Sequence, residues 1–356
     1  MKRVYWLDIL RVLSIFFVIA IHIVALNWYS GNPSTIGWNI LNVYDSISRF
    51  CVPIFLMISG CLFLDKDKID IKKLYSKNIL RLIVALLFWN FIYALVLNPE
   101  LFSNFSLKNI YNTILTFNNF RYHLWFILTL LGLYIITPLL KKITEDKKIF
   151  NYLWWLSIII GIIIPTLNSF LELLVTLTNS PYLNIYYTLT NWLFKIDIPY
   201  VSGYLVFFLT GYKIYNESIK GKKLVYILGI ISLIFTIVST SIFSNLLKNP
   251  VHNFYNYNTI NVYLYSIAIY MFFKDYISKI NLNILFQRLI NILSKCSFGI
   301  YLVHDIILIY LQRYNLYPLG LNNLLSIPIY TLIVYIISFI IIYLISKIPK
   351  INKYII

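Results

Sequence analysis

Runs of about 20 apolar residues recur along the whole chain and alternate with short polar links. An apolar run of this length crosses the hydrocarbon core of a bilayer as one helix. The pattern therefore predicts an all-α polytopic membrane protein with about ten transmembrane helices. No link is long and polar enough for a separate soluble domain, so residues 1–356 form one predicted domain. The predicted spans are Tyr5–Leu26, Val43–Leu64, Ile79–Leu97, His123–Leu140, Tyr152–Phe170, Ile198–Tyr215, Leu224–Phe243, Thr259–Phe273, Ile292–Leu311 and Leu324–Ser346.

Basic residues are concentrated in every second link. They follow the second, fourth, sixth, eighth and tenth spans, whereas the other links contain few. Lys and Arg accumulate in the cytoplasmic links of membrane proteins. The alternation therefore predicts that both termini are cytoplasmic. The basic links are Lys66–Lys77, Lys141–Lys148, Lys213–Lys223, Lys274–Arg288 and Lys347–Lys353.

The composition excludes an ordinary soluble domain. Hydrophobic residues make up 60% of the 356 residues and charged residues only 12%, about half the charged fraction of a typical soluble domain. The net charge of +17 does not indicate nucleic-acid binding, because the basic residues lie in links and not on one basic face. Membrane lipids are the expected surroundings. Cys51, Cys61 and Cys296 have no metal-ligand spacing, so we predict packing roles for them and no metal site.

The first apolar run carries three ionisable side chains, Asp8, Arg11 and His22. Ionisable groups at membrane depth are costly and mark candidate functional sites. Arg11 and His22 are eleven positions apart, which on a helix is about three turns plus 20° and about 16 Å of rise. They share one stripe at different depths, and Asp8 lies within ion-pair reach of Arg11. We therefore expect this stripe to face one lumen that links the two sides of the membrane.

Further ionisable residues at membrane depth sort into groups under the predicted orientation. Some lie near the outer side, some near the cytoplasmic side, and one pair lies near mid-membrane. The outer group is His22, Asp45, Arg49, Arg121 and His123, the inner group is Asp8, Arg11, Lys77 and Arg81, and the central pair is His304 with Asp305.

Each of these features also has a purely structural interpretation, which the sequence leaves open. Interfacial side chains, snorkelling cations and ion pairs within a bundle need carry no chemistry. Trp125 and Tyr134 are predicted to be belt or packing residues. The open alternatives are interfacial positions for His22 and His123, snorkelling for Lys77 and Arg81, and neutralising pairs for Arg11 with Asp8, Asp45 with Arg49 and His304 with Asp305.

Five segments occur in an order that is similar to one known family. The first contains Arg11, ten further residues and His22, and the five read LDILRVLSIFFVIAIHI, RFCVPIFLMISGCLFL, KNILRLIVALLFW, HLWFILTLLGLYIITPLL and SFGIYLVH. Over nearly its whole length the chain resembles the acyltransferase 3 family, bacterial integral-membrane O-acyltransferases of surface polysaccharides. It is most similar to the short stand-alone members, which carry no appended extracytoplasmic domain.

The resemblance implies a bacterial plasma-membrane O-acyltransferase. Such an enzyme takes an acyl group, acetyl being the first expectation, from cytoplasmic acyl-CoA and transfers it to a hydroxyl of a cell-surface glycan or lipid-linked sugar. Acetyl-CoA or another acyl-CoA is then the donor substrate, and no bound cofactor is expected. A homo-oligomer is compatible with the sequence but not predicted by it.

The resemblance also suggests roles for the ionisable residues. His22 is the predicted general base, because imidazole titrates near working pH. Arg11 either joins it as a catalytic residue near the thioester or binds CoA, and no Ser or Cys is placed for a covalent acyl-enzyme. The predicted acyl-CoA-binding residues are Arg11, Lys77 and Arg81, which suit phosphate groups, and the predicted acceptor-binding residues are Asp45, Arg49, His123 and His304.

Two other classes of function remain open at the level of sequence. One is a transporter or flippase for a glycan precursor, in which the buried charges form a substrate path. The absence of matching Gly/Pro-broken spans in the two halves weakens this alternative. The other is a non-catalytic membrane module, such as a sensor.

Overall fold

The computed structural model describes residues 3–98, 121–178, 203–317, 322–349 and 352–355, together with residues 185 and 188. Within these residues the chain is helical and has no strand, as predicted. The principal helices are α1 (Tyr5–Trp28), α2 (Ile36–Ser48), α3 (Cys51–Leu64), α4 (Ile71–Lys73), α5 (Leu80–Leu97), α7 (Trp125–Ile143), α8 (Lys147–Ile158), α9 (Ile164–Thr178), α11 (Leu205–Asn216), α12 (Lys222–Leu247), α13 (Ile260–Asp275), α14 (Ile284–Arg313), α15 (Asn323–Ser346) and α16 (Asn352–Ile355). Short π- and 3₁₀-helical turns join some of them: η1 (Leu74–Ile79), η3 (Tyr122–Leu124), η4 (Ile159–Ile163), η5 (Asn253–Tyr255) and η6 (Ile277–Lys279).

Eight helical segments in the described part of the chain are long and apolar enough to cross a membrane. They correspond to eight of the ten predicted spans. The remaining two are the sixth and the eighth, which appear as α11 with 12 residues and α13 with 16 residues. At 1.5 Å per residue these are about 18 and 24 Å long, shorter than a hydrocarbon core of about 30 Å. Residues 198–202, where the predicted sixth span begins, lie outside the described residues.

The eighth span is short because the chain reaches the protein interior before α13 begins. Val251, Phe254 and Tyr255 are buried although they precede the helix. Non-helical backbone is tolerated at membrane depth where protein, not lipid, surrounds it. The hydropathy pattern placed this segment in a polar loop and the eighth span at Thr259–Phe273, which agrees with α13 to within two residues.

The second span begins at Ile36 and not at Val43, and it is divided into α2 and α3 at Arg49 and Phe50. Pro53 lies in the first turn of α3. Proline has no N–H to donate to the Arg49 carbonyl, and its ring clashes with a carbonyl four residues earlier. The helix therefore breaks there, and the break leaves the Arg49 side chain directed at the loop before α13.

Small residues bring α3 and α11 into direct backbone contact. A Cβ on Gly60 would lie 1.8 Å from the carbonyl oxygen of Phe208, and a Cβ on Gly211 would lie 2.0 Å from that of Met57. Close approach through small residues is the usual way in which membrane helices associate. This contact fixes α3 beside α11.

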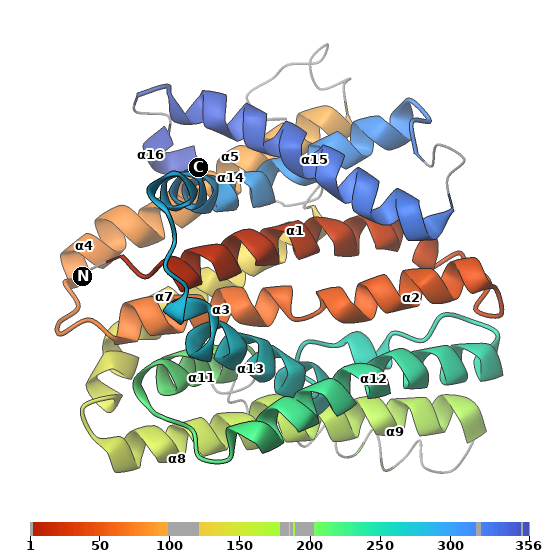
Figure 1. The fold of residues 1–356 in the computed structure, drawn as a ribbon, viewed down its shortest axis with the longest axis horizontal. Coiled ribbons are helices and arrows are strands. Elements are labelled where there is room, and N and C mark those ends of the chain that lie inside the picture. Colours follow the sequence, from red (N-terminus) through yellow and green to blue (C-terminus); the bar gives the residue numbers. More distant parts are fainter. Residues whose placement is uncertain are drawn as a thin grey trace.

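The central helix of the bundle is α1, which has α14 and α15 on one side and α2 and α3 on the other (Figure 1). α11, α12 and α13 lie beyond α3, and α8 and α9 form the opposite edge. Because α1 has helices on both sides, its ionisable residues face protein.

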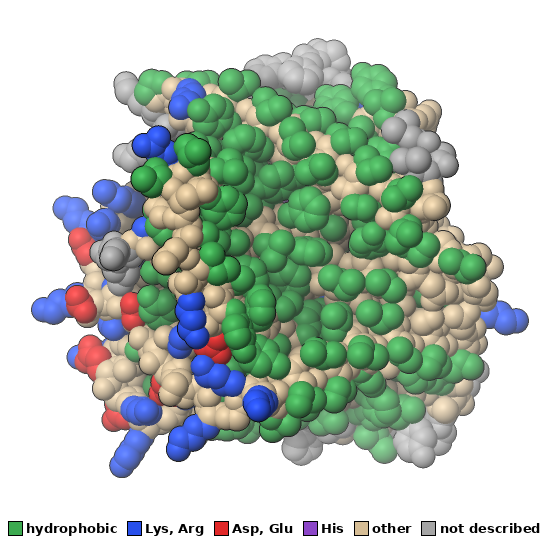
Figure 2. Space-filling model, in the orientation of Figure 1, with side chains coloured by type: hydrophobic (Ala, Val, Ile, Leu, Met, Phe, Trp, Pro, Cys, Tyr) green, Lys and Arg blue, Asp and Glu red, His purple; other side chains and the backbone are tan. Residues whose placement is uncertain are grey.

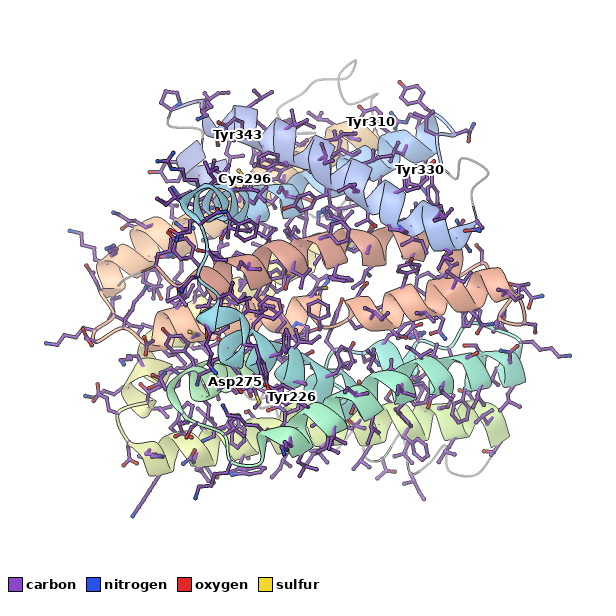
Figure 3. All side chains as sticks on the ribbon, viewed as in Figure 1. Tyr226, Asp275, Cys296, Tyr310, Tyr330 and Tyr343 are labelled. Atoms are coloured by element: carbon purple, nitrogen blue, oxygen red, sulfur yellow. The ribbon has the colours of Figure 1, made fainter. Side chains whose placement is uncertain are left out.

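Charged side chains gather at one end of the molecule, where the N-terminus also lies, and hydrophobic side chains cover most of the rest of the visible face (Figure 2). At this end Asp275 of α13 accepts hydrogen bonds from Lys222 at 2.7 Å and from Tyr226 of α12 at 3.1 Å (Figure 3). The distribution is that of a membrane protein with one strongly charged face. The cytoplasmic position of both termini stays a prediction from the basic links.

Candidate functional site

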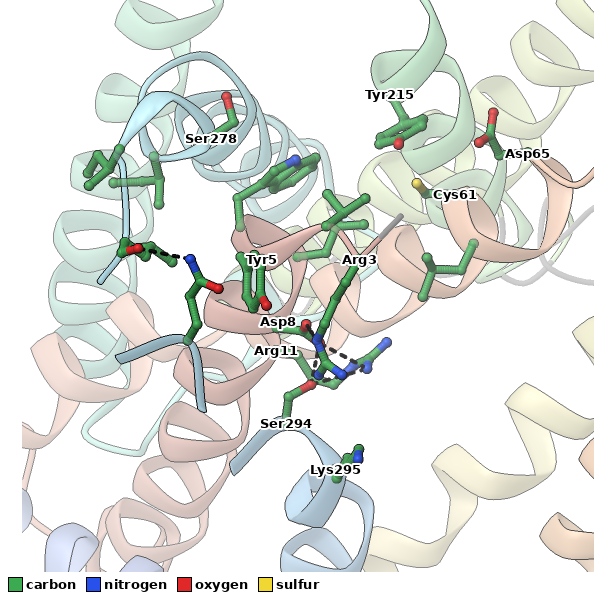
Figure 4. A pocket seen from close by; sticks show the side chains of 18 of the residues that line it. Arg3, Tyr5, Asp8, Arg11, Cys61, Asp65, Tyr215, Ser278, Ser294 and Lys295 are labelled. Carbon is green, nitrogen blue, oxygen red and sulfur yellow. Dashed lines mark hydrogen bonds and ion pairs between the residues drawn. The ribbon is translucent and has the colours of Figure 1, made fainter. Parts of the chain in front are cut away.

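The inner part of the site is built around Arg11 of α1. Its Nη1 lies 3.8 Å from an Asp8 carboxylate oxygen and 3.4 Å from Ser294 Oγ of α14. Asp8 also accepts hydrogen bonds from Arg3 at 2.7 Å and from Ser294 at 2.5 Å. These contacts tie the start of α1 to α14, and Lys295 lies beside them (Figure 4).

Two cavities meet at Arg11. The larger, of about 1140 Å³, opens at the charged end and is lined by Arg3, Asp8, Gln287 and Lys295 among others. The smaller, of about 330 Å³, extends between α3, α5, α7 and α14. Arg11, Ser294 and Lys295 line both cavities. A ligand that is anionic at one end and extended at the other would fit this pair of spaces.

Arg81 of α5 joins Arg11 in the smaller cavity. Its guanidinium lies 5.2 Å from the centre of the Phe298 ring, and Tyr134 of α7 lines the same space. Lys77, predicted to act with these two arginines, is exposed in η1 and lines neither cavity. Asn78, three residues before Arg81, lines the smaller cavity with it instead.

The outer part of the site is a cluster of three imidazoles from three helical elements. The ring centre of His22 on α1 lies 5.1 Å from that of His304 on α14 and 6.2 Å from that of His123 on η3. The His123 and His304 centres are 5.1 Å apart. We call His22, His123 and His304 the histidine cluster.

A buried carboxylate orients one side of the histidine cluster. Asp305 accepts hydrogen bonds from Arg121, one of them at 3.1 Å, and from the Tyr122 hydroxyl at 2.8 Å. His123 Nδ1 lies 3.8 Å from the same carboxylate. His304 and Asp305 do not pair with each other, because consecutive helical side chains point about 100° apart: His304 faces His22 and Asp305 faces Arg121.

Hydrogen bonds from Tyr301 and Tyr93 hold the remaining side. The Tyr301 hydroxyl donates to the His123 carbonyl oxygen, and the Tyr301 carbonyl oxygen lies 2.7 Å from His304 Nδ1. Tyr93 of α5 donates to the Leu302 carbonyl at 2.8 Å, and its ring lies 5.2 Å from that of His123. These contacts hold His123 and His304 in place.

Accessibility distinguishes the three imidazoles. His123 and His304 are 2% and 0% exposed, whereas His22 is partly exposed. A proton-transfer group must be reached by the reacting hydroxyl. His22 is therefore the most accessible member of the cluster.

The connection between the inner and outer parts does not follow the predicted stripe of α1. Ile15 and Ile19, which lie between Arg11 and His22, are fully buried. The smaller cavity instead extends from Arg11 to Tyr301, and His22 is not among the residues that line it. Tyr301 lies 5.4 Å from His123, ring centre to ring centre. The smaller cavity thus follows α14 and ends at Tyr301, a neighbour of the histidine cluster.

Two residues of the predicted outer group lie elsewhere. Arg49 donates to Asp45 at 2.6 Å, and its guanidinium lies 4.6 Å from the centre of the Tyr255 ring. Arg49 lines a separate cavity of about 470 Å³. Arg49 therefore forms the ion pair with Asp45 that the sequence left open, and it also faces a cavity in which it can contact a ligand.

Sequence reasoning assigned no role to several residues that the structure brings to the site. Tyr301 stands three positions before His304, and Tyr122 lies between Arg121 and His123, so helical spacing and adjacency were available signals. No signal in the sequence marked Ser294 or Asn78. Tyr134, predicted to be a packing residue, lines the smaller cavity. Among the described residues no three His, Cys, Asp or Glu side chains come together as metal ligands.

Comparison with known proteins gives one match. Residues 4–346 match the model of the family described as Acyltransferase domain, that is, acyltransferase 3. This match covers essentially the whole chain and confirms its resemblance to that family. No curated protein and no solved structure matches the chain.

Proposed function

Because the chain belongs to the acyltransferase 3 family, we propose that it transfers an acyl group from acyl-CoA to a hydroxyl of a surface glycan or lipid-linked sugar. It is a membrane acyltransferase. The proposal adds the donor, the acceptor, an acetyl group as the first acyl group to test, and the plasma membrane of a bacterium as its location.

One observation carries the proposal: the smaller cavity joins two arginines at one end to Tyr301, a contact of the histidine cluster, at the other. CoA is a polyanion with a long, narrow arm that ends in a thioester. Guanidinium groups bind phosphates through charge-assisted hydrogen bonds. The cationic side chains where the two cavities meet suit the phosphates of the CoA nucleotide. The smaller cavity suits the long, narrow part of CoA that ends in the thioester.

The reaction that fits this layout is direct transfer. The acceptor hydroxyl gives its proton to the His22 imidazole while its oxygen bonds to the thioester carbonyl carbon. The carbon–sulfur bond then breaks, the CoA sulfur takes a proton, and the products are an ester and free CoA. A positioned imidazole contributes about 10²- to 10⁴-fold to such a step.

The buried neighbours of His22 have supporting roles in this proposal. His304 lies against its ring, and Tyr122 lies 5.0 Å away, ring centre to ring centre. They hold the imidazole in one place, and Asp305 balances the charge of Arg121. Such preorganisation is what a base needs to act without rearrangement of its surroundings.

The test uses purified protein in lipid vesicles with radiolabelled acetyl-CoA and de-O-acylated saccharides from the envelope of the host strain. We expect label to appear in saccharide esters with the wild type and to fall by at least 100-fold with His22→Ala. His252→Ala is the matched control, because His252 is exposed in the loop before α13, and it should retain full activity.

Two results would overturn the proposal. One is full transfer by a correctly inserted His22→Ala protein. The other is wild-type protein that neither binds acetyl-CoA nor labels saccharide but moves saccharide across the vesicle membrane, which is the behaviour of a transporter.

A further inference from the structure

A third cavity, of about 470 Å³, lies apart from the two that meet at Arg11. Residues of five elements or loops contribute to it, including the break between α2 and α3, the N-terminal end of α7, and the loop before α13. We call it the outer cavity. Its lining combines aromatic rings and side-chain amides. The rings used below are Trp125, Tyr204 and Tyr257, and the polar residues are Arg49, Asn168, Glu172 and Asn258.

The aromatic part of the outer cavity is a cluster of three rings. The Trp125 ring centre lies 5.1 Å from that of Tyr204 and 6.2 Å from that of Tyr257, with interplanar angles of 32° and 30°. Rings inclined so little to one another present a broad apolar surface. A sugar ring has a face of C–H groups that covers such a surface, and a rim of hydroxyls that needs polar partners.

Polar partners of this kind line the outer cavity, and the described residues leave three of their atoms unpaired. Arg49 Nε, Asn168 Oδ1 and Asn258 Oδ1 are buried and have no hydrogen-bond partner among the residues that the structure describes. The first is a donor and the other two are acceptors. Buried polar atoms are almost always paired in native proteins, and a hydroxyl is the group that both donates and accepts.

The charges favour a ligand without a negative charge. The Arg49 guanidinium is already balanced by Asp45 at 2.6 Å. Glu172 adds a carboxylate, one oxygen of which accepts a hydrogen bond from Asn253 at 3.1 Å. Among the described residues that line the outer cavity, an anionic group would find no unbalanced cation, and Glu172 would repel it.

The outer cavity also lies close to the histidine cluster. Trp125 is only two residues after His123, so about 3 Å of helical rise separates the two positions. His123 faces the cluster while Trp125 faces the outer cavity. The outer cavity and the histidine cluster are therefore neighbouring sites that share the start of α7.

We propose that the outer cavity binds an uncharged sugar unit of the acceptor, which stacks on Trp125 and Tyr257 and bonds through its hydroxyls to Arg49, Asn168 and Asn258. The inference rests on the proposed function, since it assigns the acceptor subsite of that reaction. The proposal adds four specificity residues, Trp125, Asn168, Tyr257 and Asn258. Arg49 was the only residue of this cavity that the sequence had predicted to bind the acceptor.

The proposal is tested by binding without any acyl donor. The probes are a neutral fraction and an acidic fraction of de-O-acylated envelope saccharides from the host strain, observed by saturation-transfer difference NMR on the purified protein. We expect the neutral fraction to bind, and the dissociation constant to rise at least tenfold in Trp125→Ala and severalfold in Asn258→Ala. Trp125→Phe should restore most of the affinity.

Trp155→Ala is the matched control, because Trp155 is 58% exposed on α8 and should leave binding unchanged. The yield and thermal unfolding of Trp125→Ala are measured to establish that it inserts and folds, and Asn258→Ala supplies the second variant. Binding of only the acidic fraction, or of neither fraction, overturns the proposal. So does wild-type affinity in folded Trp125→Ala and Asn258→Ala.

Failure of this inference is distinguishable from failure of the proposed function. Acetyl transfer that is intact in the wild type and has an unchanged acceptor KM in both variants rejects the subsite but keeps the reaction. Saccharide binding that depends on Trp125 without any acetyl transfer rejects the reaction, and leaves the outer cavity as a saccharide-binding site of a protein with another activity.

Discussion

The inner cavities and the histidine cluster differ in how their polar groups are held. Around Arg11 the cations line open space: Arg11 and Arg81 face a cavity, and Arg11 has only a 3.8 Å contact with Asp8 and a 3.4 Å contact with Ser294. In the histidine cluster each buried ring lies against other rings, and Asp305 accepts bonds from two residues. Loosely held cations beside a cavity suit binding of a mobile polyanion, and a packed cluster suits chemistry that requires fixed geometry.

The strongest test of this difference is Asp305→Ala. The change leaves Arg121 without its partner against a buried cluster, and an unpaired buried charge costs about 3–5 kcal/mol. We expect the unfolding free energy in detergent to fall by about that amount and acyl transfer to be lost. Asp275→Ala, which removes a partly exposed partner of Lys222, should cost only about 0–1 kcal/mol. Equal losses in the two variants would contradict the distinction.

The next test concerns the inner cavities. Arg81→Ala removes a cation from the cavity wall, and a charge-assisted hydrogen bond is worth about 1.5–3 kcal/mol. We expect the KM for acyl-CoA to rise by roughly 10- to 100-fold while kcat changes much less. Lys77→Ala is the paired control, since Lys77 is exposed and lines neither cavity, and its KM should stay within about twofold. A large KM effect at Lys77 would support the grouping suggested by the sequence over the one in the structure.

The smallest expected effect is that of Tyr301→Phe. This change removes the hydroxyl that donates to the His123 carbonyl oxygen but keeps the ring between the smaller cavity and the cluster. A hydrogen bond of this kind contributes about 0.5–1.5 kcal/mol, so we expect kcat to fall by roughly 2- to 12-fold and the acyl-CoA KM to stay the same. Initial rates at several acyl-CoA concentrations give kcat and KM separately. A change in KM alone would place Tyr301 with the donor-binding residues.

Most of the fold could be predicted from hydropathy, including the bounds of α13, whereas the early start of the second span at Ile36 and its break before Pro53 could not. Eight spans were found because a lipid-facing helix must be long and apolar. α11 and α13 are shorter, since protein surrounds them and the loop before α13 enters the interior. Hydropathy measures how apolar a segment is, and it does not distinguish a segment that faces lipid from one that faces protein.

Part of the candidate site could also be predicted from the sequence. Ionisable residues at membrane depth marked Arg11, His22, Arg49, Arg81 and His123 from the sequence alone, because such residues are costly in lipid. Their depth along each helix followed from the helical rise.

Which of these residues meet was decided only by the tertiary structure. Helices from distant parts of the chain bring His22, His123 and His304 together, turn Asp305 towards Arg121, place Arg49 in a different cavity and leave Lys77 outside. The sequence determined the composition and depth of the polar groups, since both depend on local chain geometry and the cost of burying charge. Their partners depend on how the helices pack and rotate against one another, which neither local periodicity nor hydropathy contains.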